Sequence, residues 1–244
     1  MNLNNEFICV IIPTRNRLKL LKRSLRSVLN QNIKPIQIIV IDDASEQKVK
    51  NYISLINSKN RRIEIKYIER KNYLERSSPA SINFGFKFSK ANYIALLDDD
   101  DIWNKNYLKS CLKKIMHSRY QMVISPLYNM KNQKITKGKK ISENFKLQKW
   151  LSYNPGLICS NIFIMSKVFK KLGMLDGYLP YSADRDLMIK FNLKKYKYSI
   201  LEKRMVYYSV NNHPIRSSKF KLYLKSNLRF YLKYFFIISF GSHY

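Results

Sequence analysis

Four consecutive aspartates, Asp98 to Asp101, are the residues of this chain whose type and spacing most clearly suggest chemistry. Adjacent carboxylates repel one another unless a cation neutralises them, and their oxygens are preferred ligands of magnesium, manganese and calcium. The ordinary alternative is a solvated acidic turn, because runs of like charge usually face water. The chain has only 16 acidic residues against 46 basic ones, so a quarter of its acids lie in this run. Such concentration favours a functional site.

Other acids stand at similar places in the sequence. Asp42 and Asp43 follow an apolar run, and Asp184 and Asp186 open a segment with helical spacing. Two acids in a first helical turn also have an ordinary role, because each stabilises the helix macrodipole by about 0.3–1 kcal/mol. Together with the run at 98–101, however, these four residues make up eight of the 16 acids. Their common position at the ends of predicted elements favours a metal-dependent site.

Short apolar runs precede the acids and predict the strands that position them. These strands are Phe7–Ile12, Ile36–Ile41, Ile63–Ile68 and Tyr93–Leu97, and the first two are followed by apolar residues at helical spacing. Alternation of buried strands with helices predicts an α/β fold with a mostly parallel sheet and helices on both faces. Ligands bind such sheets beyond the carboxyl ends of the strands. Thr14, Arg15 and the aspartates would therefore face one crevice.

The rest of the chain continues this pattern with less regularity. Residues 131–149 are rich in lysine and poorly periodic, which predicts a surface loop or hairpin. The other predicted elements are a helix start at Ser77–Phe86, a helix at Tyr107–Met116, a strand at Met122–Ser125, a strand at Leu157–Met165, a short helix at Lys167–Leu172, a helix at Tyr181–Phe191 and a strand at Val206–Val210.

The last thirty residues have a different character. From Lys203 onward the chain contains no acid, and a stripe of like charge recurs at i,i+4 spacing, which would destabilise an isolated helix by about 0.2–0.5 kcal/mol per pair. Two interpretations stay open: a basic amphipathic helix lying on a membrane, or a helix packed on the domain. The stripe is Lys221, Lys225, Arg229 and Lys233, and the apolar positions beside it are Phe220, Leu224, Leu228, Tyr231 and Phe235.

The formal charge of +30 calls for an anionic partner. Nucleic acid, an anionic membrane surface and small phosphorylated ligands all qualify, and charge alone does not choose among them. Three widely spaced cysteines, Cys9, Cys111 and Cys159, predict reduced core residues and a cytoplasmic location. The first residues resemble no signal peptide, and no apolar run reaches the roughly 20 residues of a spanning helix. We expect a protein that is neither secreted by that route nor transmembrane.

Four blocks of the sequence, taken in order, resemble the family 2 inverting glycosyltransferases. They are Val10–Arg17, Ile39–Ser45, Ala95–Trp103 and Ala183–Leu187. The resemblance covers about Phe7 to Pro214 and implies the GT-A fold, a Rossmann-like α/β arrangement. We therefore expect a glycosyltransferase domain at 1–214 and a basic amphipathic C-terminal helix at 215–244, outside the resemblance.

The resemblance also implies a nucleotide-sugar donor, most often a UDP-sugar. In this family pattern Pro13, Thr14 and Arg15 contact the base and ribose, and Asp42 holds the base. His213 stands where the family often has a histidine near the diphosphate.

Asp98 to Asp100 match the DXD element of the family. Asp100 would bind manganese or magnesium with the help of Asp98, and Asp99 would lie near the ribose, while Asp184 matches the general base. Two places depart from the pattern: Ile82 stands where many members have arginine, and Ala183 where glutamate is common. These departures weaken the expected nucleotide contacts more than the expected fold.

The function expected from these observations is a metal-dependent hexosyl- or N-acetylhexosaminyltransferase. It would act on a glycan or lipid-linked acceptor in the assembly of a bacterial-type surface polysaccharide, at the inner face of the cytoplasmic membrane. The first alternative is a basic nucleic-acid-binding protein, although no recognisable binding motif accompanies the charge. The second is a catalytically silent relative that binds nucleotide without transferring a sugar.

Overall fold

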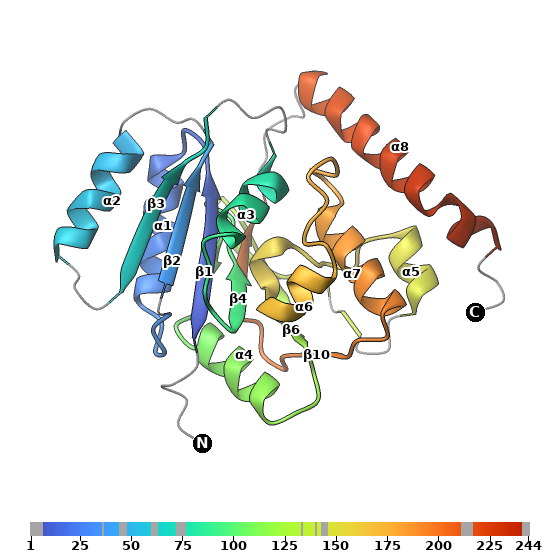
Figure 1. The fold of residues 1–244 in the computed structure, drawn as a ribbon, viewed down its shortest axis with the longest axis horizontal. Coiled ribbons are helices and arrows are strands. Elements are labelled where there is room, and N and C mark those ends of the chain that lie inside the picture. The colour runs from blue at the N-terminus through green and yellow to red at the C-terminus, as the bar shows by residue number, and fades with distance from the viewer. Residues whose placement is uncertain are drawn as a thin grey trace.

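The computed structural model describes residues 7–35, 37–43, 48–59, 63–71, 77–132, 134–139, 141–142, 146–210 and 217–240. A seven-stranded sheet with strand order β10-β6-β9-β4-β1-β2-β3 forms its centre (Figure 1). Only β9 runs antiparallel to its neighbours β4 and β6. The strands are β1 (Ile8–Thr14), β2 (Gln37–Asp42), β3 (Glu64–Glu69), β4 (Tyr93–Leu96), β6 (Met122–Ile124), β9 (Ile162–Met165) and β10 (Tyr198–Ile200).

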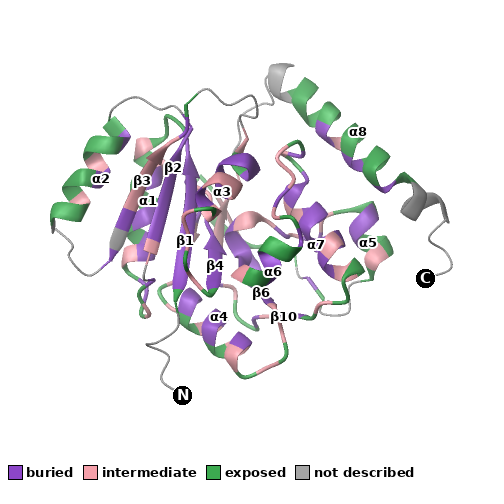
Figure 2. Ribbon diagram, in the orientation of Figure 1, coloured by how far each residue is buried: buried purple, intermediate pink, exposed green. Residues whose placement is uncertain are grey.

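Helices cover both faces of this sheet, which confirms the predicted α/β class. Along β1, Ile8, Val10 and Ile12 pack against one helical layer, while Cys9 and Ile11 pack against the other. The central strands are consequently buried throughout, as Figure 2 shows. The first layer contains α1 (Leu18–Leu29), α2 (Lys48–Lys59) and α4 (Tyr107–Met116); the second contains α3 (Ser78–Phe86), α5 (Leu147–Ser152), α6 (Ser166–Lys171) and α7 (Ala183–Leu193).

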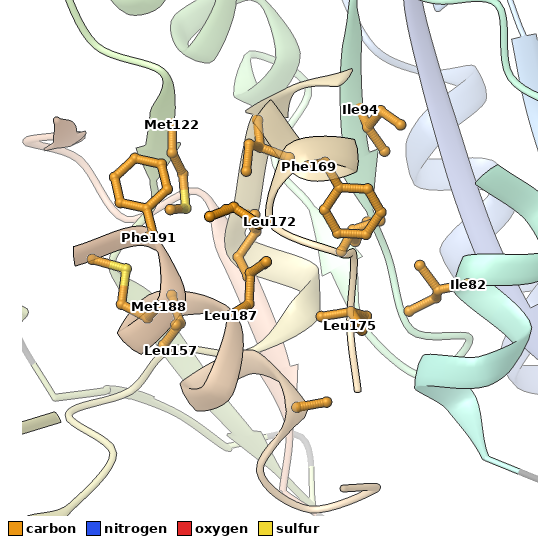
Figure 3. Packing of buried hydrophobic residues seen from close by; sticks show 14 of the residues in the cluster. Ile82, Ile94, Met122, Leu157, Phe169, Leu172, Leu175, Leu187, Met188 and Phe191 are labelled. Carbon is orange, nitrogen blue, oxygen red and sulfur yellow. The ribbon is translucent and has the colours of Figure 1, made fainter. Parts of the chain in front are cut away.

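The second layer holds α7 firmly against the sheet. Leu187, Met188 and Phe191 of α7 are fully buried in the cluster that includes Met122 of β6 and Phe169 of α6 (Figure 3). Burial of each such side chain contributes about 1.5–3 kcal/mol. This packing fixes the direction of α7, so the N-terminal turn of the helix has a defined place near the carboxyl ends of the strands.

The close approach of α3 to the sheet depends on Gly85. A Cβ atom at this position would lie 2.7 Å from Cγ1 of Ile41, so no larger residue fits without a shift. Ser77 caps the helix, accepting a hydrogen bond from the Ala80 N–H at 3.3 Å, and Pro79 lies in the first turn. The start of α3 is thereby placed beside the end of β4.

A smaller sheet with strand order β5-β11-β7-β8 lies beside the main one. It is formed by β5 (Ile102–Trp103), β11 (Val206–Ser209), β7 (Leu127–Lys131) and β8 (Lys134–Lys137), so the lysine-rich segment predicted as a loop or hairpin begins as the β7–β8 hairpin. The strand predicted from Leu157 begins only at Ile162. Asn161 accounts for this, because its side chain bonds the backbone of Ser125, Gly156 and Ile158 and stabilises a 3₁₀ turn.

The C-terminal helix α8 (Ser217–Phe240) is present and packs on the domain. Phe230 and Tyr234 are buried in the core, and the Ser226 hydroxyl accepts a hydrogen bond from the Tyr181 N–H at 3.4 Å. The domain-packing interpretation therefore holds for this face of the helix. Lys233, a member of the predicted basic stripe, lies on the same side, where its Nζ is 2.7 Å from Asp176 Oδ2 and 2.7 Å from Asp186 Oδ1. Among the described helices, none has both the length and the apolar character that crossing a membrane requires.

Candidate active site

A cleft of about 480 Å³ lies at the carboxyl ends of β1 and β4, bounded also by the starts of α3 and α7 and by β11. The predicted residues that line it are Pro13, Thr14, Arg15, Asp98, Asp99, Asp100 and Asp184. The structure thus brings together residues that are up to 171 positions apart in the chain, counted from Pro13 to Asp184. The crevice predicted from the strand ends is where these side chains meet.

The ends of β1 and β4 are joined through Asp99. The Thr14 hydroxyl donates to Asp99 Oδ2 at 2.7 Å, and the backbone N–H of Leu97 donates to the Ile11 carbonyl at 3.1 Å. Parallel pairing of the two strands explains this proximity, since β1 and β4 are neighbours in register. Asp99 is 4% exposed, so its carboxylate fixes the floor of the cleft.

Arg17 is a site residue to which the sequence assigned no role. Its Nη1 lies 3.1 Å from Asp99 Oδ1 and 3.1 Å from Asp100 Oδ2, and its side chain is 43% exposed. It stands at the N-cap of α1, directly after the end of β1, so the strand–helix connection delivers it to the acids. This guanidinium partly neutralises the run of aspartates and places a positive charge at the mouth of the cleft.

Asp98 is held by side chains from two distant segments. The Ser78 hydroxyl donates to Asp98 Oδ1 at 3.2 Å, and the Asp98 N–H donates to Ser160 Oγ at 3.0 Å. Burial, followed by the charges of Asp100 and Asp99, raises the pKa of Asp98 to about 7. Burial and the neighbouring carboxylates thus both disfavour the ionised form of Asp98, and a cation bound beside the run would stabilise that form.

Asp101 has a different task from its three neighbours. It is fully buried, does not line the cleft, and accepts a hydrogen bond from the Ser209 N–H at 2.8 Å. The Ser209 hydroxyl also donates to the Asp100 carbonyl at 2.7 Å. These bonds tie β11 to the acidic turn and bring Tyr208 to the edge of the cleft. The fourth aspartate of the run is a structural residue.

Asp184 lies in the first turn of α7 and faces the aspartates of the β4 turn across the cleft. Its Oδ1 accepts the Arg185 N–H at 2.7 Å, and its Oδ2 accepts Asn154 Nδ2 at 3.3 Å. Burial raises the pKa of Asp184 to about 6, although these hydrogen bonds act in the opposite direction. A carboxylate with this pKa is ionised at neutral pH and basic enough to accept a proton.

Not all predicted residues reach the cleft. Asp42 is fully buried and accepts a hydrogen bond from the Tyr67 hydroxyl at 2.9 Å, whereas Asp43 lines the cleft and lies 3.4 Å from Arg70 Nε. His213 lies outside the described residues, as does the predicted domain boundary at 214. The base contact of Asp42 and the diphosphate contact of His213 stay predictions.

Comparisons with known proteins agree with this geometry. Residues 9–173 match the family described as Glycosyl transferase family 2. An uncharacterized glycosyltransferase of Methanocaldococcus jannaschii is 29% identical over 241 residues, which cover 95% of this chain and 81% of the relative. A protein of Escherichia coli provisionally named as the colanic acid biosynthesis glycosyl transferase WcaA is 25% identical over 197 residues, covering 77% of this chain and 66% of the relative.

Solved structures share the fold. Residues 1–349 of S. aureus TarS superpose with a TM-score of 0.64 at 15% identity, covering 97% of this chain and 75% of that one. The same protein in complex with UDP-GlcNAc gives a TM-score of 0.65 at 15% identity, covering 88% of this chain and 64% of that one. The arrangement is that of the GT-A fold, and because the family match covers more than half of its residues, the chain belongs to glycosyl transferase family 2.

Proposed function

We propose that this protein transfers a hexose or N-acetylhexosamine from a UDP-sugar to a hydroxyl group of a glycan or lipid-linked acceptor, in the assembly of a surface polysaccharide. The observation that carries the proposal is the meeting of Asp98, Asp99 and Asp100 with Asp184 in one cleft. The UDP-GlcNAc complex of TarS supports the donor class, and the E. coli relative supports the kind of pathway.

Asp184 is the general base of this proposal. Its carboxylate takes the proton of the acceptor hydroxyl as the hydroxyl oxygen forms a bond to the anomeric carbon. The bond from that carbon to the nucleotide diphosphate breaks on the opposite side, so a single displacement inverts the configuration. The Asn154 amide, which contacts Asp184 Oδ2 at 3.3 Å, helps to fix the orientation of this carboxylate.

The acidic turn suits a magnesium or manganese ion. Magnesium in nucleotide sites is usually held by one or two carboxylates together with substrate phosphates. Asp100 and Asp98 meet this description, and within the described residues no group of three or more acids, histidines or cysteines forms a complete metal site by itself. When bound, the ion would neutralise charge on the departing diphosphate. Arg17 provides positive charge at the same place from the protein itself.

The donor class can be tested by thermal unfolding. We expect UDP with manganese to raise the melting temperature, because a ligand that binds only the folded state stabilises it by RT ln(1 + [L]/Kd), or about 2.7 kcal/mol at 100 times Kd. Asp100→Asn should abolish the manganese-dependent part of the shift. Glu202→Gln, which removes an exposed acid elsewhere, should retain it. GDP or CMP shifting the protein more than UDP would reassign the donor.

We propose that the outer face of α8 binds an anionic membrane surface. Leu228, Leu232 and Phe235 are 61%, 64% and 54% exposed, and they lie opposite the buried Phe230 and Tyr234. Lys221, Lys225 and Arg229 are exposed beside this apolar face. A helix with this division of side chains binds the boundary between headgroups and acyl chains.

Vesicle sedimentation tests this assignment. The protein should sediment with vesicles containing phosphatidylglycerol, and Leu228→Asp with Leu232→Asp should weaken this binding by at least about tenfold, since each buried leucine contributes about 1.5–3 kcal/mol. Leu55→Asp on α2, where Leu55 is 51% exposed, is the matched control and should bind normally. Equal binding to uncharged phosphatidylcholine vesicles, or equal loss in the control, would contradict the assignment.

A further inference from the structure

A second and larger cavity lies on the opposite side of β5 and β11 from the catalytic cleft. It has a volume of about 1220 Å³ and is lined by α1, by Tyr52 of α2, by residues 102–105 and by Tyr207 of β11. Tyr207 faces this groove while the next residue, Tyr208, faces the cleft, as expected for successive residues of a strand. We call this cavity the α1 groove.

The charge of the α1 groove is of one sign. Its described lining includes five cations, Lys22, Arg23, Arg26, Lys34 and Lys105, and no acidic residue. No carboxylate of the described residues forms an ion pair with any of the five. Lys22 and Arg26 stand at i,i+4 on α1 and therefore repel each other. Such an arrangement is destabilising by itself and would be relieved by an anionic ligand.

The walls of the groove are joined by hydrogen bonds rather than free to move. The Trp103 N–H donates to Ser27 Oγ at 3.1 Å, and Gln31 Nε2 donates to the Asn104 carbonyl at 2.8 Å. Gln31 Oε1 also accepts the Leu108 N–H at 3.0 Å, and Gln31 is fully buried. Because these bonds fix α1 against residues 103–108, a ligand would meet a preformed site and would lose little free energy in ordering it.

The shape of the groove distinguishes between anionic partners. A bilayer surface cannot enter a concavity whose floor includes the buried Ser27 and Trp103, whereas a single extended chain can. Tyr52 and Tyr207 add partly exposed aromatic rings to the lining, and Lys22 Nζ lies 4.9 Å from the centre of the Tyr52 ring. One face of the Tyr207 ring is stacked on Tyr128, with ring centres 5.2 Å apart, so the two tyrosines add limited apolar area to a lining dominated by cations. Such a lining suits a polymer that carries negative charges together with sugar rings.

The α1 groove is also close to the catalytic cleft. Arg17, at the start of α1, lines the cleft, and Lys22 and Arg26 on the same helix line the groove. At 1.5 Å per residue, the groove begins about 8 Å along α1 from Arg17 and continues for about 6 Å between Lys22 and Arg26. Because successive residues of a helix turn by about 100°, Lys22 and Arg26 lie on a different side of α1 from Arg17, so a polymer that occupied both sites would pass around this helix.

From these observations we infer that the α1 groove binds an anionic glycan, one carrying carboxylate or phosphate groups, and that it holds the extended part of the acceptor. That the bound glycan is the acceptor rests on the proposed transferase function, whereas the binding of an anionic glycan in the groove does not depend on it. The donor cleft does not account for the basic residues of the α1 groove, whereas binding of an anionic glycan does. The inference also narrows the class of acceptor to charged polymers.

The test uses the full chain and an oligomer of galacturonic acid as the probe. Binding should weaken steeply with salt, and Arg23→Gln with Arg26→Gln should raise the Kd at least tenfold and reduce the salt dependence, since fewer counterions are released. Lys167→Gln with Lys170→Gln removes the same charge from exposed positions on α6, across the sheet, and should leave the Kd within about twofold. A neutral maltooligosaccharide of equal length should bind at least tenfold more weakly.

Three results would overturn the inference: equal loss in the α6 control, equal binding of the neutral oligomer, or tighter binding of a single-stranded oligonucleotide that is lost in the groove variant. The last result would assign the groove to nucleic acid. The UDP-induced thermal shift of the groove variant separates this inference from the proposed function. If UDP raises the melting temperature but the protein does not bind the acidic oligomer, only the inference about the groove fails. If UDP does not raise the melting temperature of the unmodified protein, the donor assignment fails.

Discussion

Asp184→Asn is expected to lower the turnover number by about 10²- to 10⁴-fold, the usual contribution of general base catalysis. The amide cannot accept a proton, yet it keeps the size of the carboxylate, and its oxygen can still accept the Arg185 N–H or the Asn154 amide. Donor binding should be preserved, because Asp184 lies across the cleft from the acidic turn. The measurement is release of UDP under single-turnover and steady-state conditions, with KM for the donor as the internal control.

Glu202→Gln is the matched control for the loss of one negative charge, since Glu202 is exposed and lies outside the cleft. Its turnover should stay within about twofold of the unmodified protein. If Asp184→Asn kept near-normal turnover while remaining folded, the general base would have to be another group in the cleft.

The same residue sets the expected pH dependence. With the pKa of Asp184 raised to about 6, kcat/KM measured at saturating manganese, where the ion would keep Asp98 ionised, should fall about tenfold per pH unit below pH 6 and level off above it, because only the ionised form of Asp184 accepts the proton. A raised folded-state pKa also means that the native protein binds this proton more tightly than the unfolded chain. The contribution of Asp184 to the free energy of unfolding therefore decreases as pH rises from about 4 to 6, and Asp184→Asn should remove that decrease.

The sheet and most of the site were predictable because the strands are continuous apolar runs that end in polar residues. Burial on both faces removes any period from β1, β2 and β4, and it is the short length of these runs and their polar ends that identify them as strands. Parallel pairing then brings their carboxyl ends to one edge of the sheet. Thr14 and Asp99 meet for this reason, even though 85 positions separate them. The strands β5 and β10, with two and three residues, are too short to show a pattern.

Residues whose role depends on contacts between distant segments were not predictable. Nothing near Arg17 in the sequence indicates that it pairs with Asp99 and Asp100, and the serine that supports Asp98 comes from the start of α3. The pairing of Lys190 Nζ with Asp186 Oδ2 at 2.9 Å joins residues of the same helix, but the burial of Asp186 that makes this contact important depends on the packing of α7 and α8. Helical spacing showed that Lys233 shares a stripe with Lys225 and Arg229, but spacing does not show which side of a helix meets the domain.

Asp186→Ala is expected to destabilise the protein by about 3 kcal/mol, near the lower end of the cost of breaking a buried ion pair, because both lysine partners are partly exposed. Asp186 is fully buried, and its Oδ1 lies 2.6 Å from the Tyr234 hydroxyl and 2.7 Å from Lys233 Nζ. Lys190 Nζ contacts the other oxygen at 2.9 Å. The substitution leaves a buried hydroxyl and two ammonium groups without their shared acceptor, and denaturant unfolding would measure the loss.

Asp176→Ala supplies the control, because Asp176 also contacts Lys233 at 2.7 Å but its side chain is 22% exposed. This variant should lose less than about 1 kcal/mol of stability, as exposed pairs do.

Asp186 stands two residues after Asp184 in the first turn of α7, and the neighbouring Arg185 guanidinium lies 4.1 Å from the centre of the Phe230 ring. The contacts of α8 thus hold the turn that carries Asp184, the proposed general base, so Asp186→Ala should also lower turnover at temperatures where the variant is folded, whereas Asp176→Ala should not. Equal losses of stability in the two variants would contradict a special role for the buried Asp186 in holding this turn against α8.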